Sequence, residues 1–213
     1  MSHSQTRWFT VASALVLTLA GVGCSDAHAD AFHGIRGVAL QPVRGKPDFT
    51  LTDTRGQPFH FPAATRGTVT LLYFGYTNCS DVCPMQLNNI ARALHGMSAS
   101  DQSRVRVVFV TTDPARDSAQ RLRTWLDSFD SRFIGLRGPI DEVNHIQASL
   151  GLPPATVEPM NEMRGPTVPA YGVGHAAQVL AFTPDDSLRL EYPAGFTSQD
   201  WSNDLPKLVK LGR

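Results

Sequence analysis

Two short apolar runs, separated by a helix-length segment, constrain the fold of this chain more than any other feature. Residues 69–74 (Val-Thr-Leu-Leu-Tyr-Phe) and 105–110 (Val-Arg-Val-Val-Phe-Val) are nearly continuous in apolar side chains. Such runs are typical of strands that are buried on both faces, as in a sheet covered by helices. Between them, apolar residues recur at helical spacing on one face: Leu87, Ile90, Ala91 and Leu94. The sequence therefore predicts an α/β fold.

The remaining periodic segments complete an α/β domain of the thioredoxin type over residues 47–213. We expect an N-terminal β-hairpin over residues 48–61, helices over 117–129 and 140–150, a strand at 133–136, a hairpin over 179–192, and a final helix over 198–211 that is interrupted at Pro206. Residues 153–172 hold five prolines and show no periodicity. They are expected to form a long proline-rich insertion, of the kind that serves as a lid or binding loop or is a plain surface insertion.

Composition excludes several classes of protein. The 19 basic residues are balanced by 19 acidic residues, so the chain lacks the positive surplus that broad nucleic-acid binding needs. With 42% hydrophobic and 18% charged residues, it is too apolar to be disordered as a whole. No uninterrupted apolar run is long enough for a multi-pass membrane protein.

Residues 1–29 have the pattern of an export signal. Arg7 precedes a short apolar stretch over residues 8–20, and two processing sites follow. Gly21-Val22-Gly23-Cys24 resembles a bacterial lipobox, which would anchor the chain to the inner membrane by a lipid on Cys24. The small-x-small sequence ending at Ala29 would instead release a soluble protein, and an uncleaved signal would itself be an anchor. We expect a tether over residues 30–46 and a location in the bacterial periplasm, which is oxidising.

The cysteines at positions 79 and 83 are the main candidate site. Cys79 and Cys83 are four residues apart at the predicted start of a helix, directly before Pro84. This spacing lets the two sulfurs share a metal ion or form a disulfide on oxidation, and a helix N-terminus stabilises thiolates. A pair of buried structural cysteines is the alternative.

His175 is the histidine best placed to join these cysteines. It follows Gly174 and precedes an apolar strand, at the edge where a thioredoxin-type fold presents its cysteines. Spacing alone leaves a ligand role and a hydrogen-bonded loop role equally open. His60, His95 and His145 lie in predicted elements and are expected to be solvated or hydrogen-bonded residues. Met160 and Met163 in the insertion are expected to be packing residues more than thioether ligands.

Three separated motifs resemble those of the Sco/SenC family of copper proteins. They are Phe74-Gly75-Tyr76-Thr77 before Cys79-x-x-x-Cys83-Pro84, then Thr112-Asp113-Pro114-Ala115-Arg116-Asp117, and finally Tyr171-x-x-x-His175. The resemblance implies a thioredoxin-like fold, a membrane tether, and a site for Cu(I), Cu(II) or both at Cys79, Cys83 and His175. It also implies copper delivery to the binuclear copper centre of cytochrome c oxidase subunit II, or reduction of its cysteines. Asp113 is by resemblance a carboxylate of the outer shell.

The chain departs from the family pattern at two places. Family members usually have proline where Ser80 stands, and commonly have polar residues where Gly174 and Ala176 flank the histidine. Outer-shell groups orient the metal ligands and set their basicity. These departures are therefore expected to affect ligand orientation and partner contacts more than the identity of the ligands.

Three functions are compatible with the motifs. We expect a copper metallochaperone, rather than an enzyme in the turnover sense, whose partner is oxidase subunit II or another periplasmic cuproprotein. The alternative is a thiol-disulfide oxidoreductase in which Cys79 and Cys83 are the redox pair, forming a disulfide when oxidised and keeping the oxidase cysteines reduced. A peroxidase of the peroxiredoxin kind is the third. Three residues between the cysteines favour the metal site over the two-residue spacing of thioredoxin-type reductases, and a peroxidase leaves His175 unexplained.

Overall fold

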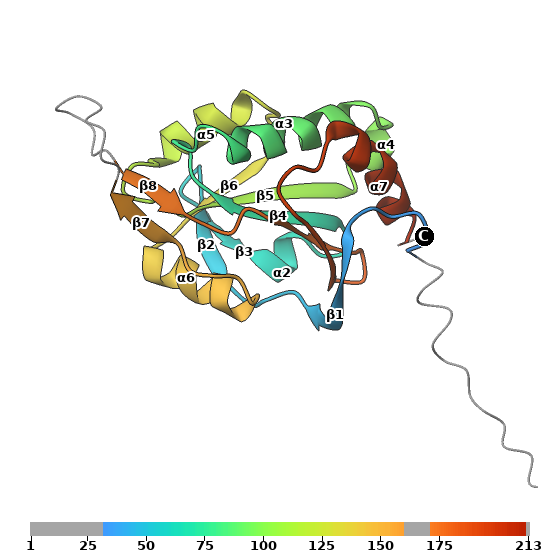
Figure 1. Ribbon diagram of the computed structural model, residues 1–213, viewed down its shortest axis with the longest axis horizontal. Helices are drawn as coiled ribbons and strands as arrows, with labels where there is room; N and C mark the ends of the chain where they lie inside the picture. Colours follow the sequence, from blue (N-terminus) through green and yellow to red (C-terminus); the bar gives the residue numbers. More distant parts are fainter. Residues whose placement is uncertain (1–31, 160–170, 212–213) are drawn as a thin grey trace, which may run out of the picture. The chain divides into compact units, whose positions relative to one another are not determined.

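The computed structural model describes residues 32–159 and 171–211 (Figure 1). The expected signal region with Cys24 and Ala29 lies outside the described residues, as do Met160 and Met163. From Gly34 onward the chain belongs to one structural unit. Among the helices of the described ranges, none is both long and apolar enough to cross a membrane.

An eight-stranded mixed sheet lies at the centre of this unit. In spatial order its strands are β1 (Val38–Gly45), β10 (Ser187–Tyr192), β9 (Val179–Phe182), β4 (Val69–Gly75), β5 (Val105–Thr111), β6 (Ile134–Arg137), β2 (Thr50–Asp53) and β3 (Pro58–His60). The pairs β4–β5 and β5–β6 are parallel, and the other pairs are antiparallel. Every residue of β4 is buried, as its apolar run predicts.

Helices cover both faces of the sheet. Figure 1 shows α3 (Val82–His95), α5 (Ala119–Asp127) and α7 (Ser198–Lys210) on one face, and α6 (Ile140–Ser149) with the short α2 (Phe61–Ala64) on the other. The short α4 (Ala99–Gln102) precedes β5. Alternate residues of β4 therefore enter different cores, since successive side chains of a strand point to opposite faces.

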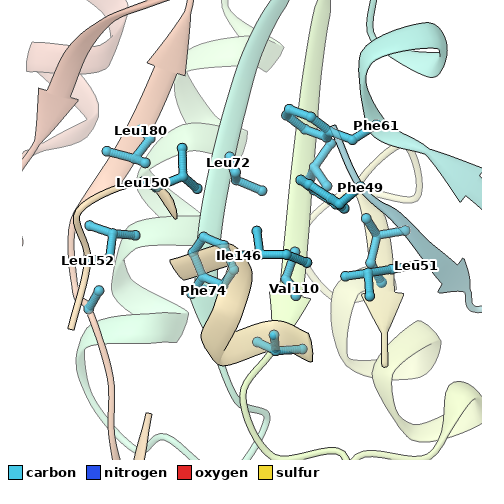
Figure 2. Close-up of a cluster of buried hydrophobic side chains, with 14 of the residues drawn as sticks. Phe49, Leu51, Phe61, Leu72, Phe74, Val110, Ile146, Leu150, Leu152 and Leu180 are labelled. Carbon is cyan, nitrogen blue, oxygen red and sulfur yellow. The ribbon is translucent and has the colours of Figure 1, made fainter. Parts of the chain in front are cut away.

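The core beneath α6 holds the side chains drawn in Figure 2. Leu72 and Phe74 from β4 and Val110 from β5 pack there with Ile146 from α6. On the other face, the Tyr73 ring meets the Phe109 ring edge to face, with centroids 5.7 Å apart. Burial on both faces makes these strands rigid supports for the loops at their carboxyl ends.

The tether expected over residues 30–46 is wrong for residues 38–45, which form the edge strand β1. This strand pairs antiparallel with β10, with Val38 opposite Glu191 and Arg44 opposite Leu188. Most of its side chains are exposed, so it lacks the apolar alternation by which a strand is recognised. Its stability comes from backbone bonds to a strand far away in the sequence, which local patterns do not reveal.

The described ends of the insertion expected over residues 153–172 are more regular than expected. Strands β7 (Thr156–Pro159) and β8 (Tyr171–Gly174) pair antiparallel, with Thr156 opposite Gly174 and Pro159 opposite Tyr171. They form a separate two-stranded ribbon. The prolines suggested a segment without strands. That expectation is wrong here, because proline is tolerated at the end of a strand and on a free strand edge.

The final helix also differs from its expectation, because α7 continues through Pro206 from Ser198 to Lys210. A capping box at Thr197 and Asp200 secures its start. Trp201, Leu205 and Leu208 are fully buried. This packing outweighs the one backbone hydrogen bond that the proline removes.

Candidate metal centre

The cysteine loop connects the carboxyl end of β4 to α3. The helix begins at Val82, so Cys83 lies in its first turn whereas Cys79 precedes it. The Asp81 side chain makes no capping bond at this helix start. Instead the Cys83 N–H donates to the Cys79 sulfur at 3.4 Å. The Cys79 sulfur thus acts as the acceptor for an otherwise unpaired helix amide, an arrangement that favours its thiolate form.

His175 directly follows β8 and contacts the same pair of cysteines. Its Nε2 lies 3.4 Å from the Cys83 sulfur, and its Nδ1 lies 3.0 Å from the Ala176 carbonyl oxygen. Because a carbonyl only accepts, Nδ1 carries a proton, and Nε2 is the ring nitrogen that faces the sulfurs. The rings of Tyr76 and Tyr73 flank the imidazole edge to face, with centroids 5.6 and 6.3 Å away.

The three side chains form one compact donor group. One ligand atom from each of Cys79, Cys83 and His175 lies within 4.8 Å of the other two. Cys83 is buried, whereas Cys79 and His175 are half-buried and reachable from solvent. The sequence prediction that these residues meet at one edge of the sheet is therefore matched by their placement.

The two cysteines have opposite electrostatic environments. The pKa of Cys79 is lowered, chiefly by a hydrogen bond from the Cys83 thiol, with further help from His175 and nearby backbone amides. The pKa of Cys83 is raised, chiefly by burial and then by the adjacent Cys79 sulfur. The environment of the metal-free pair therefore favours the thiolate at Cys79 and the protonated thiol at Cys83.

The Cys83 sulfur packs against a backbone surface that only glycine provides. A Cβ at Gly75 would lie 2.7 Å from this sulfur and 3.0 Å from the Phe109 ring. The nearby Tyr73 side chain is buried, and burial, followed by the adjacent Cys83, raises the Tyr73 pKa. The sulfur is therefore held in a fixed recess beside a neutral phenol.

This donor set fits a soft or borderline metal ion. Two thiolates and one imidazole suit copper and zinc, whereas hard cations prefer oxygen ligands. A donor group of three, with two members near solvent, leaves room for a ligand from a partner. The residues present therefore fit copper.

Asp113 does not contact the three donors, although the resemblance placed it in the outer shell. It is buried and forms an ion pair with Arg116. Its carboxylate also accepts a hydrogen bond of 2.8 Å from the Tyr171 hydroxyl. Tyr171 opens β8, the strand that ends directly before His175. The link from Asp113 to the site therefore passes through β8.

Asp117 is a site-supporting residue that the sequence analysis missed. Its buried carboxylate accepts from the Thr77 amide at 3.0 Å, the Thr77 hydroxyl at 2.5 Å and the Thr111 hydroxyl at 2.6 Å. Thr77 lies two residues before Cys79, so Asp117 ties the cysteine loop to β5. Its place in the Thr112–Asp117 motif is the only sequence signal that marks it.

The remaining histidines of the described chain that were weighed above have other surroundings. His60 bonds to Asp48 at 2.7 Å, and His95 bonds to Asp130 at 3.1 Å. His145 is exposed on α6. These residues do not join the donor group, in agreement with the sequence analysis.

Comparison with known proteins gives consistent matches. The family model described as SCO1/SenC matches residues 39–210. A Stutzerimonas stutzeri protein, provisionally named for copper binding, is 32% identical over 170 residues, which cover 80% of this chain and 79% of that protein. The mouse mitochondrial SCO2 homolog is 37% identical over 106 residues, which cover 49% of this chain and only 41% of the mouse protein.

Solved structures give the same result. A copper-bound structure of ScoI from Bradyrhizobium japonicum superposes with a TM-score of 0.64 at 29% identity, covering 76% of this chain and 98% of that one. The expected thioredoxin-like α/β fold class is thereby confirmed.

Proposed function

Because the chain belongs to the SCO1/SenC family, we propose that it is a copper metallochaperone that assists assembly of the binuclear copper centre of cytochrome c oxidase subunit II. The observation that carries this proposal is the meeting of two sulfurs and one imidazole nitrogen within 4.8 Å. Copper is the cargo and Cys79, Cys83 and His175 are its ligands.

The burial of the ligands suggests an order of release. Cys83 is enclosed by the sheet, whereas Cys79 and His175 are half-buried. A ligand from a recipient protein can therefore reach the copper on the side of Cys79 and His175. Those two ligands are exchanged first, and Cys83 holds the cargo until the recipient has replaced them.

One segment outside the described residues is part of this proposal. The signal pattern of residues 1–29 supports export to the periplasm, with Cys24 as a lipid anchor. In that compartment the donor cysteines face oxidising conditions, so a reductant must keep them in the copper-binding form. With β1 and the residues bonded to Asp204 included, the copper-binding domain begins near residue 34.

A direct test is copper titration of the reduced protein. We expect one copper per chain in the parent, weaker binding in His175→Ala and loss of tight binding in Cys83→Ala. His95→Ala is the matched control, because His95 is a half-exposed histidine bonded to Asp130. Equal affinity in His175→Ala and the parent would remove His175 from the site.

The recipient is tested separately by transfer. The copper-loaded chain is mixed with the copper-free soluble domain of oxidase subunit II, and the recipient's binuclear copper absorption is followed. Absorption that appears with the parent and not with Cys83→Ala supports delivery. Retention of copper by the parent would overturn the delivery role while leaving copper binding intact.

The asymmetry of the cysteines favours a second candidate function, thiol-disulfide exchange. The half-buried Cys79 thiolate would attack a partner disulfide, forming a mixed disulfide and releasing one partner thiolate. Cys83 would then lose its proton and attack Cys79, which releases the second partner thiol. Two electrons pass to the partner and a Cys79–Cys83 disulfide remains, which an external dithiol must reduce. Reduction of a subunit II disulfide by the copper-free chain, lost in Cys79→Ser, would establish this activity.

A further inference from the structure

A buried ion pair lies between the turn after β5 and the strand that leads to His175. Arg116 Nε contacts the Asp113 carboxylate, and the two side chains are 11% and 3% exposed. Removing both charges from water is costly, and a well-packed apolar pair is often as stable. The ion pair is therefore expected to contribute little net stability, and its directional contacts are expected to position neighbouring residues.

Those contacts converge on Tyr171, the first residue of β8. Arg116 Nη1 donates to the Tyr171 carbonyl oxygen at 3.0 Å. The guanidinium carbon lies 3.5 Å from the centroid of the Tyr171 ring, within the range of a cation–π contact. The Tyr171 hydroxyl donates to Asp113 at 2.8 Å. Both the backbone and the side chain of Tyr171 are thus fixed to the turn after β5.

Arg116 also faces the ring that lies beside the imidazole. Its guanidinium carbon is 5.8 Å from the centroid of the Tyr76 ring, and that ring is 5.6 Å from the His175 ring. Tyr171 is only four residues before His175 in the sequence, and β8 spans most of that distance. The Arg116 guanidinium therefore contacts the strand that leads to His175 and also faces Tyr76, whose ring packs against the imidazole.

We propose that Arg116 is a positioning residue for His175, with Asp113 as its counter-ion and Tyr171 as the group on which it acts. It holds β8 against the turn after β5, so that the imidazole Nε2 stays directed at the sulfurs. The part of this inference that concerns metal affinity rests on the proposed function. The part that concerns the placement of His175 does not.

The cysteines have a separate support, which makes the proposal selective. Asp117, in the same turn as Arg116, bonds to Thr77 in the cysteine loop. Arg116 donates to the Tyr171 carbonyl oxygen in β8, and its guanidinium also faces the Tyr76 ring in the cysteine loop. Because the Asp117 bonds to Thr77 remain when Arg116 is replaced, loss of the Arg116 contacts should disturb the imidazole more than the sulfur pair.

Arg116→Met is the main variant, since it keeps an unbranched apolar stem and removes the charge and the donors. Removing an outer-shell partner typically weakens metal binding 10- to 100-fold, so we expect about a tenfold loss of copper affinity. In the His175→Ala background the same substitution should change affinity by less than about threefold, because coupled residues are non-additive. Arg116→Lys, which keeps the charge, should restore part of the affinity.

Arg132→Met is the matched control. Arg132 also pairs with a buried aspartate close to it in the sequence, Asp130, but Asp130 bonds to His95, which lies outside the donor group. We expect parental copper affinity in this variant. An equal loss of affinity in Arg132→Met would show a general effect of ion-pair removal and would overturn the proposal.

Amide hydrogen exchange of the copper-free chain separates this inference from the proposed function. Arg116→Met should raise exchange at residues 171–175 while β4 and β5 keep their protection. Unchanged exchange at residues 171–175 would overturn the inference, as would a tenfold affinity loss that persists without His175.

If the parent binds no copper, the proposed function fails, and the exchange result still decides whether Arg116 positions His175. Tyr171→Phe, which removes a single hydrogen bond, is the second variant if Arg116→Met does not fold.

Discussion

At the scale of single residues, the two sulfurs of the site occupy different surroundings although they belong to one short loop. Cys79 is half-buried, and its thiolate is stabilised by the Cys83 thiol and by the start of α3. Cys83 is buried and keeps its proton. The pair can therefore exist as one thiolate and one thiol, bind a metal ion as two thiolates, or attack a disulfide through the Cys79 thiolate.

This asymmetry predicts proton release on metal binding. The pKa of Cys79 is lowered, so this residue enters the complex without losing a proton at neutral pH. The pKa of Cys83 is raised, so it must lose one proton to bind copper. Copper affinity should thus rise with pH across the neutral range, by about tenfold per pH unit for a single proton. Calorimetry in buffers of different ionisation enthalpy counts the protons, and pH-independent affinity would contradict the assignment.

Gly75 is expected to be the least replaceable neighbour of Cys83. In Gly75→Ala the new methyl would lie 2.7 Å from the sulfur, and overpacking of this kind costs about 1–3 kcal/mol. Urea unfolding should show that loss, together with weaker copper binding because the sulfur is displaced. Gly45→Ala is the control, since a Cβ there meets nothing within 4 Å. Equal losses of stability and copper affinity in Gly75→Ala and Gly45→Ala would contradict the close packing of the Cys83 sulfur against Gly75.

The three donors could be identified from the sequence, but their supports could not. Cys79 and Cys83 are marked by their spacing before a helix, and His175 by its place after Gly174 and by the family resemblance. Arg116 and Tyr171 are 55 residues apart and meet through the packing of β8, which no local pattern reports. Asp113 was selected by resemblance alone, and only the structure shows that its carboxylate is bonded to Tyr171 at the start of β8.

At the scale of elements, predictability follows burial. The strands β4 and β5 are buried on both faces, and their apolar runs identify them directly. The exposed edge strand β1 and the proline-containing ribbon β7–β8 carry no such pattern. Their strands are stabilised by backbone pairing with distant partners, so the sequence indicated a tether and an irregular insertion in their place.

The segment before β1 is fixed by a buried carboxylate on α7. Asp204 accepts hydrogen bonds from the backbone amides of Arg36 and Gly37 at 2.9–3.0 Å and from the Tyr192 hydroxyl at 3.0 Å. These bonds attach the first residues of the domain to its last helix. Asp204 is therefore the residue that sets where the N-terminal segment joins the domain.

Asp204→Ala should destabilise the fold strongly. Each buried donor left unpaired costs about 1–3 kcal/mol, so a total loss of roughly 3 kcal/mol or more is expected in urea unfolding. Hydrogen exchange over residues 36–45 should rise most. The control is Asp127→Ala, which removes a surface ion pair with Arg123 and should change stability by less than about 0.5 kcal/mol. A loss in Asp204→Ala no larger than in this control would contradict the role of Asp204.

At the scale of the whole molecule, the site lies where three separate segments meet at the carboxyl ends of β4 and β5. The cysteine loop follows β4, the turn with Asp113 and Asp117 follows β5, and His175 follows β8. That turn bonds to both of the other segments through Asp117 and Arg116. These bonds hold the three segments together before any metal arrives, which limits the ordering cost of binding.

Oxidation should switch this molecule off as a copper carrier. Cys79 and Cys83 are both free thiols here, with their sulfurs within 4.8 Å of each other. A Cys79–Cys83 disulfide removes both thiolates, so oxidised protein should bind no copper until a dithiol reduces it. Mass spectrometry after iodoacetamide labelling reports the state of the pair. Two freely alkylated cysteines after mild oxidation would contradict the expected disulfide.

X-ray absorption spectroscopy of the Cu(I)-loaded, reduced protein tests the central claim most directly, because it reports the ligand atoms themselves. The donor group predicts a copper ion bound by two sulfurs and one imidazole nitrogen, with the nitrogen contribution lost in His175→Ala and unchanged in His95→Ala. A spectrum with sulfur ligands only, or one that does not change in His175→Ala, would contradict the account.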